Sequence, residues 1–156
     1  MRIRILLSVF VFVFFFLVSG CGPDDSPEEQ IRLFIKAGEE AAEARDAGAL
    51  KKLIAENYED AHRRTRRDIT ALAGRYFLAN KNIHIFTRVG KLLFSEKDTA
   101  ELQLYVAMTG RNAADSNALL NMQADLYLFD LLLVWVNKEW RLMSADWRPA
   151  GREDFF

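Results

Sequence analysis

The spacing of apolar residues changes at residues 80–82, and this change constrains the fold more than any other feature of the sequence. Before it, apolar residues recur three or four positions apart, as between Ile31 and Ile35, which is typical of one face of a helix. After it they alternate with other residues, as Ile83 and Ile85 do, which is typical of a half-buried strand. Helices are therefore predicted before residue 80 and strands after it.

The first helix is predicted from its capping residues. Ser26 is suited to the N-cap, Pro27 to the first helical position, and Glu29 stands where a capping box has its carboxylate. The helix is expected to run to about Asp46, with Gly48 in the break that follows. A second, shorter helix is expected to carry Leu50, Leu53 and Ile54, and a third to start near Asp68, to carry Ile69, Leu72, Ala73, Tyr76 and Phe77, and to end at residues 80–82.

Short polar turns separate the alternating segments, so neighbouring strands are expected to pair in an antiparallel way. Three N-terminal helices packed on a mostly antiparallel sheet belong to the α+β class. One segment, residues 124–136, is apolar on both faces, so its strand is expected to be central or covered on both sides. The expected strands cover residues 83–88, 91–95, 99–109, 124–136 and 140–147, with turns at 96–98 and 137–139 and a long loop at 110–123.

Two apolar segments near the end of the chain carry a family resemblance. Residues 131–136, Leu-Leu-Leu-Val-Trp-Val, are followed by a turn and by residues 140–147, Trp-Arg-Leu-Met-Ser-Ala-Asp-Trp. With the order of helices and strands, this hairpin resembles the last hairpin of the nuclear transport factor 2-like superfamily, also called the cystatin-like cone fold. The resemblance covers roughly residues 28–150. It implies a curved sheet around the long first helix, with an apolar pocket closed by the helices at one end.

The first 20 residues have the pattern of a secretory signal. Arg2 and Arg4 form a positively charged start, and the 14 residues from Ile5 to Val18 are apolar except for Ser8. A run of this length is short for a membrane-spanning helix, which needs about 20 residues. An uncleaved membrane anchor is the less favoured alternative.

The signal ends in Leu17-Val18-Ser19-Gly20-Cys21, which resembles the lipobox of bacterial lipoproteins. The resemblance implies cleavage before Cys21 and attachment of acyl chains such as palmitate to it, and two or three chains suffice for stable anchoring. We therefore expect a signal peptide at 1–20, a lipidated tether at 21–27 and one domain at 28–156. Gly22, where enteric lipoproteins retained in the inner membrane have aspartate, slightly favours the outer membrane.

Charge and cysteine content limit the function classes. The chain has 21 Lys and Arg against 22 Asp and Glu, and Arg2 and Arg4 leave with the signal, so the mature net charge is near −3. A weakly acidic domain does not favour nucleic acid as a partner. Cys21 is the single cysteine, so an intramolecular disulfide is excluded and the exported domain depends on its own core.

Enzymes of the superfamily that the chain resembles, such as ketosteroid isomerase and scytalone dehydratase, place acids, tyrosines and histidines inside the cone. Asp130 is the sharpest candidate here, because it is the lone carboxylate in the apolar stretch of residues 126–136. If it faces the pocket, burial would suit it to acid–base chemistry; the alternative is a bulge or an ion pair with Arg88 or Arg141. The other catalytic candidates are Tyr58, Tyr76 and His84, and further polar residues are Asp60, His62, Tyr105 and Asp146.

His62 and His84 are the only histidines and lie on different predicted elements. Their spacing matches no zinc-binding pattern, so neither a metal nor a cofactor is expected.

Four arginines crowd the segment before the third helix: Arg63, Arg64, Arg66 and Arg67. One interpretation is contact with anionic lipid headgroups, since the lipid anchor would hold the domain near a membrane. A docking site for an acidic partner is another. A solvated basic turn, balanced by Glu56, Glu59, Asp60 and Asp68, is the third.

The expected function is non-catalytic: a membrane-tethered periplasmic domain that binds a small apolar ligand or an envelope protein partner. One alternative is an enzyme of the isomerase, dehydratase or cyclase type that uses pocket acids, and another is a structural subunit that forms a homodimer through the open face of its sheet. The orientations of Asp130, Tyr58, Tyr76 and His84 discriminate between them. Convergence in one pocket favours the enzyme, and an apolar pocket favours the binding module.

Overall fold

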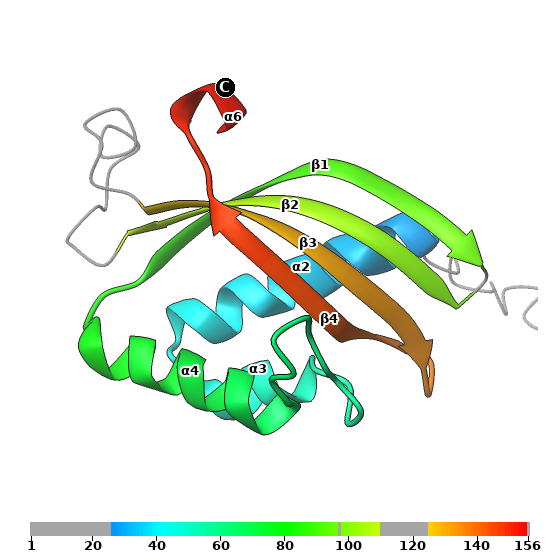
Figure 1. Cartoon of the computed structure of the whole chain (residues 1–156), viewed down its shortest axis with the longest axis horizontal. Helices are drawn as coiled ribbons and strands as arrows, with labels where there is room; N and C mark the ends of the chain where they lie inside the picture. The colour runs from blue at the N-terminus through cyan, green and yellow to red at the C-terminus, as the bar shows by residue number, and fades with distance from the viewer. Residues whose placement is uncertain (1–25, 97, 110–124, 156) are drawn as a thin grey trace, which may run out of the picture.

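The computed structural model describes residues 26–96, 98–109 and 125–155, so the expected signal, Cys21 and the loop at 110–123 lie outside the described residues. In this part of the chain, three helices precede the strands, as predicted, and one short helix that was not predicted follows them (Figure 1). None of the helices in these ranges is long and apolar enough to cross a membrane. The elements are α2 (Pro27–Glu43), α3 (Ala47–Lys52), α4 (Arg66–Ala79), β1 (His84–Glu96), β2 (Thr99–Thr109), β3 (Asp125–Val136), β4 (Glu139–Pro149) and α6 (Arg152–Phe155).

The four strands form one sheet in the order β1-β2-β3-β4, and all three pairings are antiparallel. β3 lies between β2 and β4, so the expectation that this strand is central is confirmed. The sheet is curved, and α2, α3 and α4 lie on the side toward which it curves (Figure 1). The predicted α+β class, with three N-terminal helices on a curved antiparallel sheet, is confirmed.

The main core lies between α2 and the concave face of the sheet. Ile31 and Ile35, on the predicted apolar stripe of α2, pack with Leu102 of β2 and Leu133 of β3. Ile31, Leu102 and Leu133 are at most 1% exposed. Burial of one such side chain contributes about 1.5–3 kcal/mol, so this stripe fixes the position of α2 across the sheet.

The first helix ends earlier than predicted. α2 stops at Glu43, and Arg45 then has a φ of 55°, a left-handed conformation in which a right-handed helix cannot continue. Asp46 caps the next helix, because its side chain accepts a hydrogen bond from the Ala49 N–H at 2.9 Å. Gly48 therefore lies inside α3, and the prediction that placed it in a break was wrong.

The second and third helices also differ from prediction at their ends. α3 ends at Lys52, and Ile54 lies beyond it in an isolated bridge to β4. α4 begins at Arg66, two residues before Asp68. The reason is a capping box: Thr65 is the N-cap, and its backbone N–H donates to the Asp68 carboxylate at 2.9 Å.

Residues 83–88 and 91–95, predicted as two strands, form the single strand β1. The pairing with β2 is irregular between Val89 and Lys91, and Gly90 lies at that bulge. A Cβ atom on Gly90 would lie 2.6 Å from a ring carbon of Tyr105, so only glycine allows this close approach.

A two-residue turn joins β3 to β4. Asn137 and Lys138 have φ angles of 53° and 65°, the conformation that hairpin turns of this length favour. Glu139, predicted to be part of the turn, already belongs to β4.

The outer edge of β4 is covered by the chain that follows α3. The Leu142 N–H donates to Leu53 O at 2.8 Å, and the Ala55 N–H donates to Leu142 O at 2.9 Å. The Glu59 N–H reaches Met143 O at 3.2 Å. These bonds satisfy strand groups that would otherwise offer an open edge for pairing with another chain. They also bring the segment 53–65, with its tyrosine, acid and arginines, against the sheet.

Candidate functional site

A partly open cavity of about 680 Å³ lies between the concave side of the sheet and the helices α2 and α4. Its walls are largely aliphatic and aromatic, and Glu39 and Arg75 are the charged residues among the described residues that line it. Volume and lining are those of a site for a small apolar molecule. Representative wall residues are Ile35, Ile69, Ala73, Leu104, Phe129 and Leu131.

A polar contact crosses one wall of this cavity. The Thr87 hydroxyl of β1 donates to the Glu39 carboxylate of α2 at 2.6 Å, and both residues line the cavity. Sequence reasoning missed this pair. The residue spacing did indicate that both face the cavity, since Glu39 follows Ile35 by one helical turn and Thr87 is two residues from Ile85 along the strand.

Tyr76 lines the cavity from α4, and Tyr127 lines it from β3. Burial raises the pKa of Tyr76, and the negative charge of Asp125 raises it further. Its phenol therefore stays protonated and can donate a hydrogen bond to a ligand oxygen.

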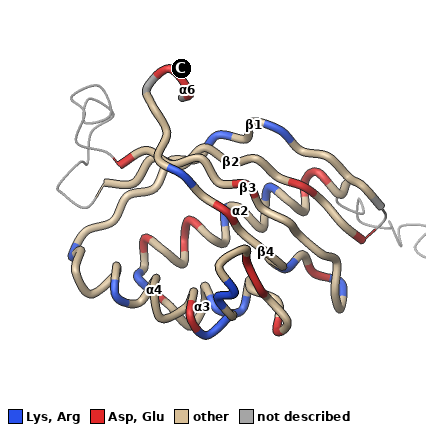
Figure 2. Tube along the Cα trace, viewed as in Figure 1, with Lys and Arg blue, Asp and Glu red and all other residues tan. Residues whose placement is uncertain are grey.

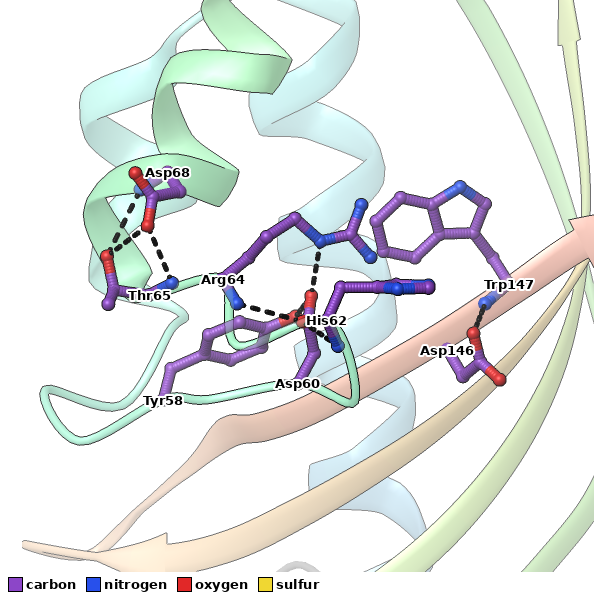
Figure 3. A network of polar contacts seen from close by, with 8 residues as sticks. All are labelled: Tyr58, Asp60, His62, Arg64, Thr65, Asp68, Asp146 and Trp147. Carbon is purple, nitrogen blue, oxygen red and sulfur yellow. Dashed lines mark hydrogen bonds and ion pairs between the residues drawn. The ribbon is translucent and has the colours of Figure 1, made fainter.

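A second polar cluster lies outside the cavity, in the segment that covers β4 (Figure 3). Tyr58 is buried, and its hydroxyl donates to the Asp60 carboxylate at 3.3 Å. Burial raises the pKa of Tyr58 to about 12, and the negative charge of Asp60 and the hydrogen bond to it act in the same direction.

Asp60 is the centre of that cluster. Its side chain is fully buried and accepts hydrogen bonds from the backbone N–H groups of His62 at 2.9 Å and Arg64 at 3.0 Å. The Arg64 guanidinium also donates, at 2.7 Å, so that with the Tyr58 hydroxyl the carboxylate accepts four hydrogen bonds. Burial alone would raise the pKa of Asp60, but these bonds and the charge of Arg64 outweigh it and hold the pKa below its ordinary value.

The same cluster touches the cavity wall through an aromatic ring. The Arg64 guanidinium lies 4.2 Å from the centre of the Trp147 ring (Figure 3), and Trp147 stacks on Phe129 at 5.8 Å. Trp147 and Phe129 both line the cavity. With every polar atom of Asp60 engaged inside the protein, the cluster serves to hold a loop and a wall residue in place.

The four catalytic candidates do not converge. Tyr76 lines the cavity, whereas Tyr58 belongs to the second cluster. His84 is half-buried at the start of β1, outside the cavity lining. Asp130 is exposed and does not line the cavity either.

The expectation that Asp130 could serve the pocket was wrong for a geometric reason. Its neighbours Phe129 and Leu131 line the cavity, so the alternation of the strand turns Asp130 to the convex face. There it accepts a hydrogen bond from the Gln103 amide at 3.2 Å. Neither arginine named as its partner bonds to it: Arg88 donates to Asp154 O at 2.6 Å, and Arg141 pairs with Glu139.

The remaining predicted polar residues have separate surroundings. His62 is exposed and contributes its backbone N–H to Asp60. Tyr105 lies 4.2 Å beneath the Arg88 guanidinium. Asp146 is exposed, and its carboxylate accepts the Trp147 N–H at 2.9 Å. Within the described ranges, no group of three or more metal-ligating side chains comes together.

The four arginines divide into two pairs. Arg64 is bound to Asp60, and Arg66 donates to Lys51 O at 3.0 Å, the carbonyl at the end of α3. Arg63 and Arg67 are exposed. Figure 2 shows acidic and basic positions interleaved along the helices and the segment between α3 and α4.

No protein-family profile and no curated protein matches this sequence. Solved structures do match the fold. A candidate dehydratase of the NTF2-like family from Streptomyces avermitilis superposes with a TM-score of 0.63 and 16% identity, over 81% of this chain and 97% of that one. A domain of unknown function with a cystatin-like fold from Nostoc punctiforme gives a TM-score of 0.62 and 15% identity, over 86% and 83%.

A third structure, Bd1075 of Bdellovibrio bacteriovorus, gives a TM-score of 0.62 and 8% identity over 77% of this chain. This chain spans only 40% of that protein's length. The matches confirm the predicted cone fold, which the NTF2-like and cystatin-like structures named above share. At such low identities they establish the fold and no activity.

Proposed function

We propose that this cone-fold domain is a lipid-anchored, periplasm-facing lipoprotein that binds a small apolar ligand in its cavity. The observation that supports ligand binding is the cavity of about 680 Å³, whose lining is mostly apolar. Sites for small molecules typically enclose about 300–1,000 Å³ and combine apolar walls with a few polar groups. Glu39, Thr87 and Tyr76 supply such groups here.

Binding rather than catalysis is favoured by the placement of the acids. An isomerase or dehydratase needs an acid or base within hydrogen-bond reach of the substrate. Asp130 lies on the convex face, and the Asp60 carboxylate is engaged in hydrogen bonds within the protein. An enzyme built on Glu39 and Tyr76 is the remaining catalytic alternative, and capture of an envelope protein is the alternative within the binding class.

The anchoring part of the proposal comes from the sequence. The signal-like segment, the lipobox-like residues and the lone Cys21 support a lipid anchor, and Gly22 favours the outer membrane over the inner. The first helix begins at Pro27, so only a short tether would separate the cone from the membrane.

A thermal-shift experiment tests ligand binding. Residues 24–156 are screened against steroid-like and lipid-like compounds, after circular dichroism has established that the domain is folded. A ligand at 100 times its Kd stabilises by about 2.7 kcal/mol, which raises the Tm of a domain of this size by roughly 10 °C. The absence of any stabilising compound in either class would count against the proposal.

A matched pair of variants then locates the site. Ala73 of α4 lines the cavity and Ala71 of the same helix is exposed. Ala73→Phe fills part of the cavity and is expected to weaken the selected ligand's binding roughly tenfold or more, the effect of losing about 1.4 kcal/mol. Ala71→Phe should leave the affinity unchanged. Equal effects of the two substitutions would show that the ligand binds elsewhere.

A further inference from the structure

A second hollow lies outside the cone, at the end of the molecule where the β3–β4 hairpin turns. It is a surface groove of about 1,130 Å³ between the start of α2, the end of α3 and this hairpin. Its floor is aromatic, because Trp135 and Trp140 line it with their ring centres 5.3 Å apart. Phe94, beside the groove, has its ring centre 6.0 Å from that of Trp140. The Trp140 N–H donates to Gln30 of α2 at 3.3 Å, which joins the hairpin to the first helix.

Three large apolar side chains stand exposed around this floor. Leu33 is 49% exposed, Val136 44% and Phe94 37%, and we call these three residues the apolar rim. Leu33 and Val136 line the groove, and Phe94 contacts its Trp140. Apolar side chains gathered around an aromatic floor, rather than scattered singly, mark a surface that contacts something other than water.

Polar residues surround the apolar rim. Lys52, Arg66, Lys138 and Arg141 line the groove together with two acids, Glu56 and Glu139, so the lining has a net charge of about +2. Both acids are ion-paired with arginines of the same groove. Aromatic rings, aliphatic side chains and lysines together are characteristic of residues that lie at the headgroup level of a bilayer.

The end of the molecule that carries the groove lies only a few residues from the proposed anchor at Cys21. Figure 1 shows that α2 begins at the end of the molecule where the β3–β4 hairpin turns, whereas the end of α4 and the start of β1 lie at the opposite end. From Cys21 to Pro27 there are six residue steps, which span at most about 20 Å when fully extended. A lipid on Cys21 therefore keeps the groove end within a short reach of the membrane.

We propose that the end of the cone that carries the apolar rim rests on the lipid bilayer, with Leu33, Phe94 and Val136 in the headgroup region. The proposal rests on the anchoring part of the proposed function. A bilayer is favoured over a protein partner because the short tether leaves little room for a protein between this end and the membrane. The anchor also makes the contact intramolecular, so a small surface suffices.

Site-directed spin labelling of the full mature lipoprotein tests this orientation. The lipid occupies the thiol of Cys21, the single cysteine of the chain, so an introduced cysteine is the only one that reacts. Val136→Cys reports on the apolar rim. Leu78→Cys is the matched control, because Leu78 is an exposed apolar residue, 88% exposed, near the far end of α4.

Each labelled protein is reconstituted into phosphatidylcholine vesicles, and the accessibility of the label to oxygen and to a water-soluble nickel complex is measured. We expect a several-fold higher oxygen-to-nickel ratio at position 136 than at position 78. Equal, water-like ratios at both positions, in protein that floats with the vesicles, would overturn the proposed orientation but not the lipid anchor. A protein would then be the expected occupant of the groove. Protein that neither carries acyl chains nor floats would instead overturn the anchor, and with it this proposal.

Discussion

The Asp60 carboxylate accepts a hydrogen bond from Arg64 Nε at 2.7 Å, and this ion pair holds the guanidinium over the Trp147 ring. Asp60 is fully buried, whereas the Arg64 side chain is 29% exposed. The pair thus ties a loop at the edge of β4 to an aromatic residue of the cavity wall. A polar cluster without contact to the cavity interior can in this way control the shape of the cavity.

Removing the charge of Asp60 should destabilise the domain. Asp60→Asn keeps the size of the side chain but weakens the bonds from Arg64 and from two backbone N–H groups. We expect a loss of about 2–4 kcal/mol in the free energy of unfolding, because the charge-assisted hydrogen bonds to a fully buried carboxylate are weakened. Urea denaturation measures it. Glu59→Gln, at an exposed neighbour, is the control, and an equal loss in both variants would contradict the role of Asp60.

Lowering the pH should remove the stabilisation that the ionised Asp60 gives to the wild-type domain. The pKa of Asp60 is lowered in the fold from its ordinary value of 3.8. The stabilisation is therefore present above about pH 4 and is lost as the pH falls through the folded pKa. Unfolding free energies measured from pH 6 downward should fall more steeply for the wild type than for Asp60→Asn. Parallel curves would show that another group is responsible.

Raising the pH above 10 should destabilise the domain through Tyr58. Its pKa is raised from 10.0 to about 12, so the neutral phenol stabilises the fold. This contribution is fully present below pH 10 and is lost as the pH rises through about 12. The tyrosinate absorbance should show a late ionisation step that Tyr58→Phe removes. The chain has four tyrosines, and persistence of the step in the variant would assign it to another of them, such as Tyr76.

Replacing Cys21 tests the anchor. Cys21→Ala removes the thiol to which the lipid would be attached. Acyl labelling should disappear, and the precursor should stay uncleaved, as shown by metabolic labelling with a fatty acid and by gel mobility. An acyl-labelled Cys21→Ala protein would contradict the lipoprotein assignment.

The headgroup hypothesis for the basic turn now concerns its two exposed arginines. Arg63→Gln with Arg67→Gln should weaken binding of residues 24–156 to anionic vesicles roughly tenfold or more, since each charge near such a surface is worth about 1 kcal/mol. Arg64→Gln and Arg66→Gln should act mainly on stability, because both side chains are bound within the protein. Vesicle co-sedimentation of the folded variants measures the effect. Unchanged binding by the Arg63/Arg67 double variant would dispose of the hypothesis.

The boundaries that sequence reasoning missed have specific physical causes. The helix break came from the left-handed conformation of Arg45, and no residue type there signals it. The fusion of two predicted strands into β1 depends on Gly90, whose lack of a side chain accommodates the Tyr105 ring. That ring belongs to another strand, so the requirement is visible only once the two strands are paired.

The sequence by itself determined that helices precede the sheet, that Ser26 caps the first of them, and that a tight turn joins β3 to β4. Periodicity, capping and turns depend on residues close together in the chain. Only the tertiary structure decided which side chains meet. Pairing and register turned Asp130 to the convex face, and the cover over β4 placed the Arg64 guanidinium over the Trp147 ring. Those outcomes depend on contacts between distant segments, and a change of one residue in register would reverse the face of every side chain in a strand.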